Sequence, residues 1–414
     1  MDDGSRRGPW PRAFVGGAVL LGLALRLAFG LLYWNGQVLT RDELEYLSLA
    51  RSLAAGHGFV YDEVMRAGPF TPFGRSPGYP VFLAVIGAGG RVFTSTPVAV
   101  KVAQAVVGAI GVWLAALLAF RLGGTRAARA TAVIAAIYPP LVWVAAFVWS
   151  ESIFWPLGLF IAWLFDREIA KGDRSRVGFL CGVVVGLGIL TRPALILFLP
   201  LAGAYLIWKR RVRTVGLMAI GVLLVYLPWT ARNYVFHGRV MVVASDGGVT
   251  FWTGNNPLAI GEGDMAANVA IKRDNVRLRA AHPGLSEEEM EHFYYDEAFR
   301  WMRARPVDWL ILEMKKAFYL VVPIGPSYTL HSTRYFVASV VSYGALLVLG
   351  LIAIARERER LSAAPGLWLL AGSAVLVCLV FFPQERFRIP LIDPALVVLG
   401  GVGVATLRPR TFRT

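Results

Sequence analysis

The chain has 414 residues, of which 56% are hydrophobic and 17% charged, and its mean hydropathy is +0.56. A soluble core cannot bury that much apolar surface, so the composition excludes a soluble domain and indicates a polytopic membrane protein. The formal net charge is +15, but the basic residues fall in short clusters between apolar runs, which is the positive-inside pattern and does not indicate nucleic-acid binding. These clusters are Arg121/Arg126/Arg129, Arg167/Lys171/Arg174/Arg176, Lys209/Arg210/Arg211/Arg213, Arg356/Arg358/Arg360 and Arg408/Arg410/Arg413.

The first predicted membrane span covers residues 13–34. Its nearly uninterrupted apolar run is as long as the roughly 20 residues that a helix needs to cross about 30 Å of hydrocarbon. A cleavable signal peptide would have a shorter apolar core and a small-residue cleavage site, whereas this run is full length and contains Arg26. We therefore expect a mature membrane anchor.

An outward loop, residues 35–96, follows the first span. Thr40 and Glu43 have the spacing of a capping box, which predicts a helix from residue 41 to about residue 56. A second apolar run in this loop, residues 78–93, would break the alternation of inside and outside if it crossed the membrane. We expect it to form a helix that lies on the outer membrane surface.

Two adjacent carboxylates, Asp42 and Glu43, open this predicted helix just beyond the first span, where a solvated acid still touches the lipid surface. Asp42 shares a helix face with Glu45 and Tyr46, whereas Glu43 points about 100° away. Glu43 therefore has an alternative role as the capping acid, and Asp42 has none. We predict Asp42 and Glu43 as catalytic candidates and Tyr46 as a candidate substrate contact.

With the basic clusters on the cytoplasmic side, the sequence predicts ten crossings and places both termini inside. Gly178, Gly182 and Gly186 recur at four-residue spacing, which predicts close helix packing. Cys181 and Cys378 lie in apolar segments and indicate neither a disulfide framework nor a metal site. The nine crossings after the first cover residues 97–120, 127–147, 150–165, 177–190, 193–208, 214–234, 335–355, 366–382 and 389–407.

A second outward loop covers residues 235–334. Ser286 and Glu289 have capping-box spacing, which predicts a helix that runs to about Arg303. The apolar run 309–322 is expected to form another interfacial helix. We therefore expect an all-α protein in three parts: a membrane module (1–234) with the catalytic loop 35–96, an outer cap (235–334), and C-terminal transmembrane helices (335–414).

Charged and amide side chains gather near the predicted outer interface. Such groups are costly next to hydrocarbon, so they tend to be functional or paired, and their convergence on one side of the membrane indicates a site. They are Asp42, Glu43, Arg75, Glu151, Arg192, Arg232, Asn233, Asn255, Asn256, Arg386 and Arg388.

The arginines among them indicate an anionic ligand, because the guanidinium fork suits phosphate oxygens. We predict that they bind the phosphate of a lipid headgroup at the outer leaflet. In the alternative, each arginine pairs with ordinary phospholipid or with a nearby acid, such as Glu385 beside Arg386 or Glu151 opposite Arg192. The four phosphate-binding candidates are Arg75, Arg192, Arg386 and Arg388.

The segment from Val249 to Pro257 places Phe251 and Trp252 ahead of Asn255 and Asn256. Aromatic rings and side-chain amides suit a sugar, the rings for its apolar face and the amides for its hydroxyl groups. The same residues also make a good turn, and that alternative stays open. We add Asn255 and Asn256 to the candidate substrate contacts, together with Tyr46, Glu151 and Arg232.

Taken together, these stretches resemble the GT-C class of lipid-dependent membrane glycosyltransferases, in the branch of the protein mannosyltransferases and the lipid A aminoarabinose transferases. The resemblance implies an outer-loop Asp as base, arginines on the lipid phosphate, and a polyprenyl-phosphate sugar donor. We expect the chain to depart from some relatives in not having their large C-terminal outer domain, which leaves the acceptor open. The stretches are residues 42–43, 75–80, 138–140 with 150–151, 191–193, 228–234, 254–257, and 386–388 with Pro390.

The implied reaction agrees with the chemistry of these residues. A sugar that departs from lipid phosphate leaves an already ionised group, so cations suffice and a general acid is unnecessary. One carboxylate can accept the proton of the acceptor hydroxyl, which contributes roughly 100- to 10,000-fold. We therefore expect inverting transfer with Asp42 as base. The sequence requires no cofactor, but a divalent cation that bridges Asp42 or Glu43 to the phosphate stays open, since hard cations favour carboxylate oxygens.

The expected partners are a polyprenyl-phosphate-linked sugar, membrane lipids, and an acceptor that is a glycan, a lipid or a protein. Alternatives are a lipid-diphosphate oligosaccharide ligase or polymerase, a transporter or flippase of an anionic lipid, and a non-enzymatic scaffold. Only six of the 42 basic residues are Lys, which hints at a GC-rich bacterial genome. We expect the protein in the bacterial inner membrane with its active site facing outward.

Overall fold

The computed structural model describes residues 8–62, 75–171, 175–238, 247–263, 267–326 and 332–407. Within these ranges the chain is helical, and extended pairing is confined to an isolated antiparallel bridge between Val38 and Ser95. Arg6, Arg7, Arg174 and the last basic cluster lie outside the described residues. The predicted class, an all-α polytopic membrane protein, is confirmed.

Helices coincide with all of the predicted crossings. Four are long and apolar enough to span a membrane: Arg12–Tyr33, Val98–Ile137, Val212–Phe236 and Thr333–Leu361. The first of these comprises α1 (Arg12–Ala28) and a π-helical turn (Phe29–Tyr33). The helices at the other predicted crossings, some of them shorter, are α5 (Val98–Ile137), α7 (Glu151–Lys171), α8 (Ser175–Thr191), α9 (Phe198–Trp208), α10 (Val212–His237), α15 (Thr333–Leu361), α16 (Pro365–Val380) and α18 (Ile392–Thr406).

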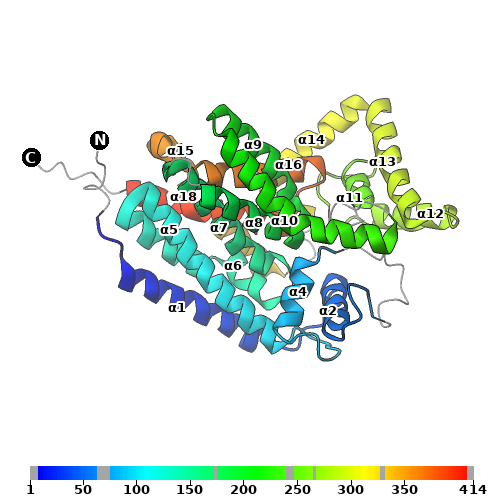
Figure 1. The fold of residues 1–414 in the computed structure, drawn as a ribbon, viewed down its shortest axis with the longest axis horizontal. Coiled ribbons are helices and arrows are strands. Elements are labelled where there is room, and N and C mark those ends of the chain that lie inside the picture. The colour runs from blue at the N-terminus through cyan, green and yellow to red at the C-terminus, as the bar shows by residue number, and fades with distance from the viewer. Residues whose placement is uncertain are drawn as a thin grey trace, which may run out of the picture.

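Shorter helices lie between and outside these. Residues 35–96 contain α2 (Arg41–Ala54) and α4 (Gly78–Val85), which pack on each other. The start of α1 and the end of α18 lie at one end of the molecule, and α2, α4 and α11 to α13 lie at the other (Figure 1). The remaining short helices are α6 (Pro139–Trp143), α11 (Gly247–Gly254), α12 (Val269–Ala281), α13 (Glu287–Ala304), α14 (Pro306–Val321) and α17 (Glu385–Arg388).

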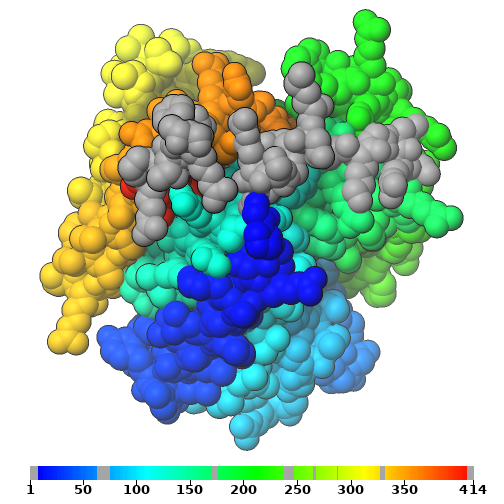
Figure 2. Space-filling view, turned by 90° about the vertical axis from the view of Figure 1, so that its left-hand side faces the viewer, coloured from blue at the N-terminus to red at the C-terminus, as the bar shows by residue number. Residues whose placement is uncertain are grey.

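The main core lies where α5, α7, α15 and α18 meet, and a second core joins α7 to α8, α9 and α10. Seen from the end where α1 begins, the green residues of α9 and α10 and the yellow-to-orange residues of α14 and α15 lie on opposite sides of α1 (Figure 2). Close packing of α8 on α10 depends on Gly182, because a Cβ there would lie 2.2 Å from the carbonyl oxygen of Met218. This confirms the packing predicted from the glycine spacing.

Residues 97–147 differ in detail from the two predicted crossings. α5 bends at Gly124, whose φ of 72° suits glycine. The helix then ends at Ile137, so the predicted crossing 127–147 is wrong from residue 138 on, where α6 and a 3-10 turn (Val144–Ala146) replace it. Two consecutive prolines cause this break.

Pro139 and Pro140 have no N–H groups, so the carbonyls of Ala135 and Ala136 lose the main-chain donors that a continuing helix would supply. Arg26, which is 1% exposed, replaces both. Its Nη2 donates to Ala135 O at 3.2 Å and its Nη1 to Ala136 O at 3.5 Å. Arg26 therefore caps the end of α5 inside the core, and the redirected chain leads to Ser150 and Glu151.

Both predicted capping boxes are present, at Thr40/Glu43 and at Ser286/Glu289, and they open α2 and α13. α4 has eight residues and is about 12 Å long, too short to cross about 30 Å of hydrocarbon. α14 has 16 residues and follows α13 directly. The interfacial placement of these two helices and the three-part division of the chain stay predictions.

Candidate active site

The site is built around the first turn of α2. Asp42 is 34% exposed and each of its carboxylate oxygens meets an arginine. Arg75 Nη2 lies 2.5 Å from Oδ1, and Arg386 Nη1 lies 2.6 Å from Oδ2. Burial alone would raise the pKa of Asp42, but the attraction of the two guanidinium groups outweighs it and holds the pKa well below its usual range.

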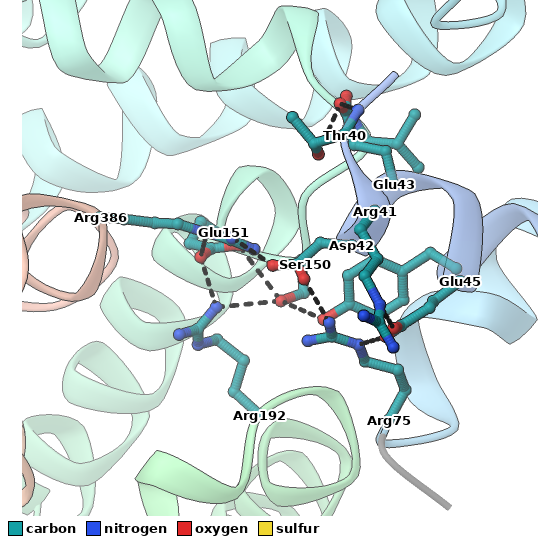
Figure 3. A network of polar contacts seen from close by, with 12 residues as sticks. Thr40, Arg41, Asp42, Glu43, Glu45, Arg75, Ser150, Glu151, Arg192 and Arg386 are labelled. Atoms are coloured by element: carbon teal, nitrogen blue, oxygen red, sulfur yellow. Dashed lines mark hydrogen bonds and ion pairs between the residues drawn. The ribbon is translucent and has the colours of Figure 1, made fainter. Parts of the chain in front are cut away.

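Glu151, at the start of α7, continues the network. Its side chain is 0% exposed and it pairs with Arg386 Nε and, at 2.7 Å, with Arg192 Nη1. Arg192 also donates to Ser150 Oγ at 3.1 Å. The result is a network of alternating charges that runs from Arg75 through Asp42, Arg386 and Glu151 to Arg192 and continues beyond Arg75 to Glu45 (Figure 3).

This arrangement brings together residues that are far apart in the sequence. Asp42 and Arg386 are separated by 344 positions, and Glu151 and Arg386 by 235. Burial disfavours the charged form of Arg386, but Glu151 and Asp42 raise its pKa above the usual value. The structure thus supports the alternative in which arginines pair with acids, but Arg386 pairs with Glu151 and Asp42 and not with its neighbour Glu385.

Aromatic rings hold the guanidinium groups in place. The Arg75 guanidinium lies 5.1 Å from the ring centre of Tyr46, and that of Arg386 lies 4.3 Å from the ring centre of Trp149. The Tyr46 hydroxyl also donates to Ser150 Oγ at 3.4 Å. Stacking fixes the plane of each guanidinium and therefore the direction in which it donates.

Sequence reasoning missed three members of the site. Glu45 accepts from Arg75 Nε at 2.7 Å, although it was expected only to share a face with Asp42. Trp149 and Ser150 directly precede Glu151, which was a candidate, and could have been found by that adjacency. The i, i+3 relation between Asp42 and Glu45 was the available signal for Glu45.

The structure does not bring Glu43 into this network. Its Oε2 accepts from the backbone N–H and the hydroxyl of Thr40, both at 2.8 Å, and its Oε1 accepts from Val148 N at 2.9 Å. Glu43 is 2% exposed and is turned away from the partners of Asp42. Its contacts are those of the capping role stated as an alternative.

Arg388 also lies outside the network, although it is two residues from Arg386. Residues i and i+2 of a helix point in different directions, and α17 is helical over both arginines. Arg388 Nε donates to Asp393 Oδ1 at 2.8 Å, and its guanidinium lies 3.5 Å from the ring centre of Tyr343. The two arginines therefore belong to separate clusters.

Arg232 lies at the outer part of α10. It donates to Phe59 O and to Asn233 Oδ1, both at 3.1 Å, and its guanidinium lies over Trp229. These contacts tie α10 to the segment that follows α2. The charged pairs of Asp42 and Glu151 are made by other arginines, namely Arg75, Arg192 and Arg386.

The two amides of the cap are engaged with the protein itself. Asn255 Nδ2 donates to Phe251 O and Val380 O, both at 2.9 Å, and its Oδ1 accepts from Lys316 Nζ at 3.0 Å. Asn256 Nδ2 donates to Trp252 O at 2.7 Å. Both residues are buried, so their contacts support the turn rather than an open sugar site.

Within the described ranges, no group of three or more His, Cys, Asp or Glu side chains is arranged to hold a metal ion. The carboxylates of Asp42 and Glu43 face different partners and do not form a shared cation site in this arrangement. The carboxylates close to the arginines are Asp42, Glu45 and Glu151.

Comparisons with known proteins agree with the resemblance. Residues 75–232 match the family model of dolichyl-phosphate-mannose-protein mannosyltransferase. That segment, less than half of the chain, carries Arg75, Glu151 and Arg192. A comparison with curated proteins finds no match.

The fold is similar to that of the archaeal oligosaccharyltransferase AglB from Archaeoglobus fulgidus. The structure with an inhibitory peptide and a dolichol-phosphate has a TM-score of 0.56 at 16% identity, and covers 96% of this chain and 50% of that one. The structure tethered with an acceptor peptide has a TM-score of 0.60 at 15% identity, with the same coverage. The chain thus spans about half the length of the oligosaccharyltransferase.

ArnT from Cupriavidus metallidurans bound to undecaprenyl phosphate is also similar, at 14% identity over 95% of this chain and 77% of that one. Its TM-score of 0.43 is too low to establish a shared fold. The resemblance to GT-C membrane glycosyltransferases is therefore confirmed by the family-model match over residues 75–232 and by the fold shared with the oligosaccharyltransferase.

Proposed function

We propose that the protein is an inverting glycosyltransferase that moves a sugar from a polyprenyl-phosphate donor to an acceptor hydroxyl at the outer face of the membrane. The main support is that Asp42, a partly exposed carboxylate, lies between the guanidinium groups of Arg75 and Arg386. The matched family model names a lipid-phosphate sugar, and AglB was solved with a dolichol-phosphate.

In this proposal Arg75, Arg192 and Arg386 bind the donor phosphate. Each of them now donates to a carboxylate, and phosphate oxygens accept the same charge-assisted hydrogen bonds. Glu151 keeps Arg192 and Arg386 oriented while the phosphate binds. Arg388 takes no part in phosphate binding here, because its guanidinium is held by Asp393 and Tyr343.

Asp42 is the proposed base. While two arginines bind it, the carboxylate is a weak base, because the pKa is held well below its usual range. A donor phosphate competes for Arg75 and Arg386, which weakens both ion pairs and raises the pKa. Asp42 then accepts the proton of the acceptor hydroxyl as the hydroxyl oxygen attacks the anomeric carbon. The bond to the phosphate oxygen breaks on the opposite face, and lipid phosphate departs with its electron pair.

We keep Glu43, Arg232, Asn255 and Asn256 as supporting residues, since their hydrogen bonds hold the cap of α2 and the outer turns. A divalent cation on Asp42 stays a prediction, and unchanged turnover in a strong chelator would contradict it. The bacterial inner membrane and an outward-facing site are likewise part of the proposal.

The direct test is a screen of polyprenyl-phosphate sugars against the purified protein in liposomes, with released lipid phosphate as the readout. Water or a simple alcohol serves as a slow acceptor, so the natural acceptor need not be known. Competition between monophosphate and diphosphate lipids separates this proposal from an oligosaccharide ligase or polymerase. Lipid movement across the bilayer without release of lipid phosphate would support a flippase and contradict the proposal.

A further inference from the structure

A fully buried amide, Gln104 of α5, lies behind the site. Its Nε2 donates to Ala145 O at 3.0 Å and to Phe147 O at 2.8 Å. Its Oε1 accepts from the Tyr79 hydroxyl at 2.6 Å and from the Ser152 hydroxyl, whose single hydrogen it shares with Trp149 O. An amide side chain offers two donor hydrogens and two acceptor lone pairs, and all four are used here.

These partners belong to segments that carry parts of the charged network around Asp42, which includes Arg75, Arg386 and Glu151. Tyr79 follows Arg75 by four residues and lies in the first turn of α4. Ser152 directly follows Glu151 in the first turn of α7. The Phe147 carbonyl precedes Trp149, whose ring stacks on Arg386. Gln104 thus joins α4, the 3-10 turn and α7 to the long helix α5.

A second path links Gln104 to Arg75 through aromatic rings. The ring of Tyr79 meets that of Tyr46 edge to face, with centres 4.8 Å apart. Tyr46 in turn lies under the Arg75 guanidinium and donates to Ser150. A displacement of Tyr79 would therefore move the surface on which Arg75 rests.

We propose that Gln104 is a positioning residue that fixes the segments bearing Arg75 and Glu151 relative to each other, and so sets the geometry around Asp42. The inference rests on the proposed function. Glutamine is required because four bonds need two donors and two acceptors. Glutamate would offer the carbonyls of Ala145 and Phe147 no hydrogen, and methionine would satisfy none of the four partners.

The experiment compares Gln104→Met and Tyr79→Phe with Leu118→Ala, a buried position of the same helix whose side chain packs in the main core. A misplacement of about 1 Å in a catalytic site costs roughly 10²-fold. We therefore expect Gln104→Met to lower kcat by about 10²-fold, and Tyr79→Phe by less. Leu118→Ala should lower Tm while kcat, measured below the new Tm, stays near that of the unmodified protein.

The double variant Gln104→Met/Tyr79→Phe should be no slower than Gln104→Met, because both changes remove the same link. Folded Gln104→Met with unchanged kcat would overturn the inference, and so would a kcat loss equal to that of Leu118→Ala. If Gln104→Met does not fold, Tyr79→Phe and Ser152→Ala decide, and unchanged kcat in both overturns the inference.

If the unmodified protein transfers no sugar from any donor, the proposed function fails and amide hydrogen exchange decides the positioning role. Faster exchange at Val148 and Ser152 in Gln104→Met, but not in Leu118→Ala, would uphold it. Unchanged exchange at both amides would overturn it.

Discussion

Arg386 and Arg388 lie two residues apart on α17 and belong to two charged clusters of different character. Arg386 joins a network with several acids and arginines, in which Asp42 is one-third exposed. Arg388 meets Asp393, whose side chain is 0% exposed, and Tyr138 donates to the other oxygen of Asp393 at 2.8 Å. The first cluster can exchange partners with a ligand, whereas the second is sealed in the core.

The difference shows that a charge near the membrane is not functional by that fact alone. What separates the clusters is access: a reacting group must reach substrate, and a structural ion pair must exclude water. α17 carries one arginine of each cluster. The buried ion pair of Arg388 and Asp393 fixes this short helix, which presents Arg386 to Asp42.

The largest expected effect separates the two acids. Asp42→Asn removes the proposed base, so kcat should fall by roughly 10²- to 10⁴-fold with little change in Tm. Asp393→Asn removes the carboxylate that pairs with the buried Arg388, so the free energy of unfolding should fall by about 3 kcal/mol. Transfer assays and thermal unfolding in detergent measure both, with Asp308→Asn as an exposed control. Appreciable turnover in Asp42→Asn would remove the base from the mechanism.

The second prediction separates the two arginines. Lysine keeps the charge but not the fork, so Arg386→Lys cannot bridge Asp42 and Glu151 as arginine does. Since the loss of one preorganised donor costs roughly 10²- to 10³-fold, we expect kcat/KM for the donor to fall by about 10²-fold. Arg388→Lys should lower Tm and leave kcat/KM of the folded protein nearly unchanged. Equal kinetic losses in both variants would contradict the division into two clusters.

The helices could be predicted because their signals are local. The capping boxes at Thr40/Glu43 and Ser286/Glu289 act over three residues, and the structure has both. The separation of Arg386 from Arg388 could not be predicted, because the segment reads as a loop until α17 turns the two side chains apart.

The residues that support the site could not be predicted either, because their contacts join segments that are distant in the sequence. Arg75 and Glu151 were predicted from their polarity beside hydrocarbon, but Gln104 was not, because its partners lie 25 to 48 positions away. Arg26 was read only as evidence against a signal peptide. Its capping role depends on the fold, which brings the end of α5, just before the two prolines, next to Arg26 of α1.

The third prediction concerns pH. In the free protein the pKa of Asp42 lies below its usual range, so its charged form persists as pH falls and is lost only below that range. The acid limb of kcat/KM, which reports the free enzyme, should therefore lie below the usual Asp pKa of about 3.9. Donor phosphate weakens the ion pairs, so the acid limb of kcat should lie at higher pH. Coincident limbs would contradict the release of Asp42 by the donor.

Arg75→Gln is the matched control for this profile. It removes one of the two cations that lower the pKa of Asp42, so the acid limb of kcat/KM should move to higher pH. Asp308→Asn should leave the limb where it is, because Asp308 is exposed and pairs with Arg305 at 4.0 Å. If the acid limb of kcat/KM does not move in Arg75→Gln, the limb reports the titration of a group other than Asp42.

The smallest expected effect concerns Glu43, which neighbours Asp42 in sequence but faces Thr40 and Val148. Glu43→Gln keeps one acceptor oxygen for the start of α2, so the free energy of unfolding should fall by only about 1 kcal/mol, as for other weakened caps. Because the carboxylate of Glu43 is engaged with Thr40 and Val148 and not with Arg75 or Arg386, kcat should change by no more than a small factor. A kcat loss as large as that of Asp42→Asn, without loss of helix, would show that Glu43 takes part in the chemistry, which the present contacts do not require.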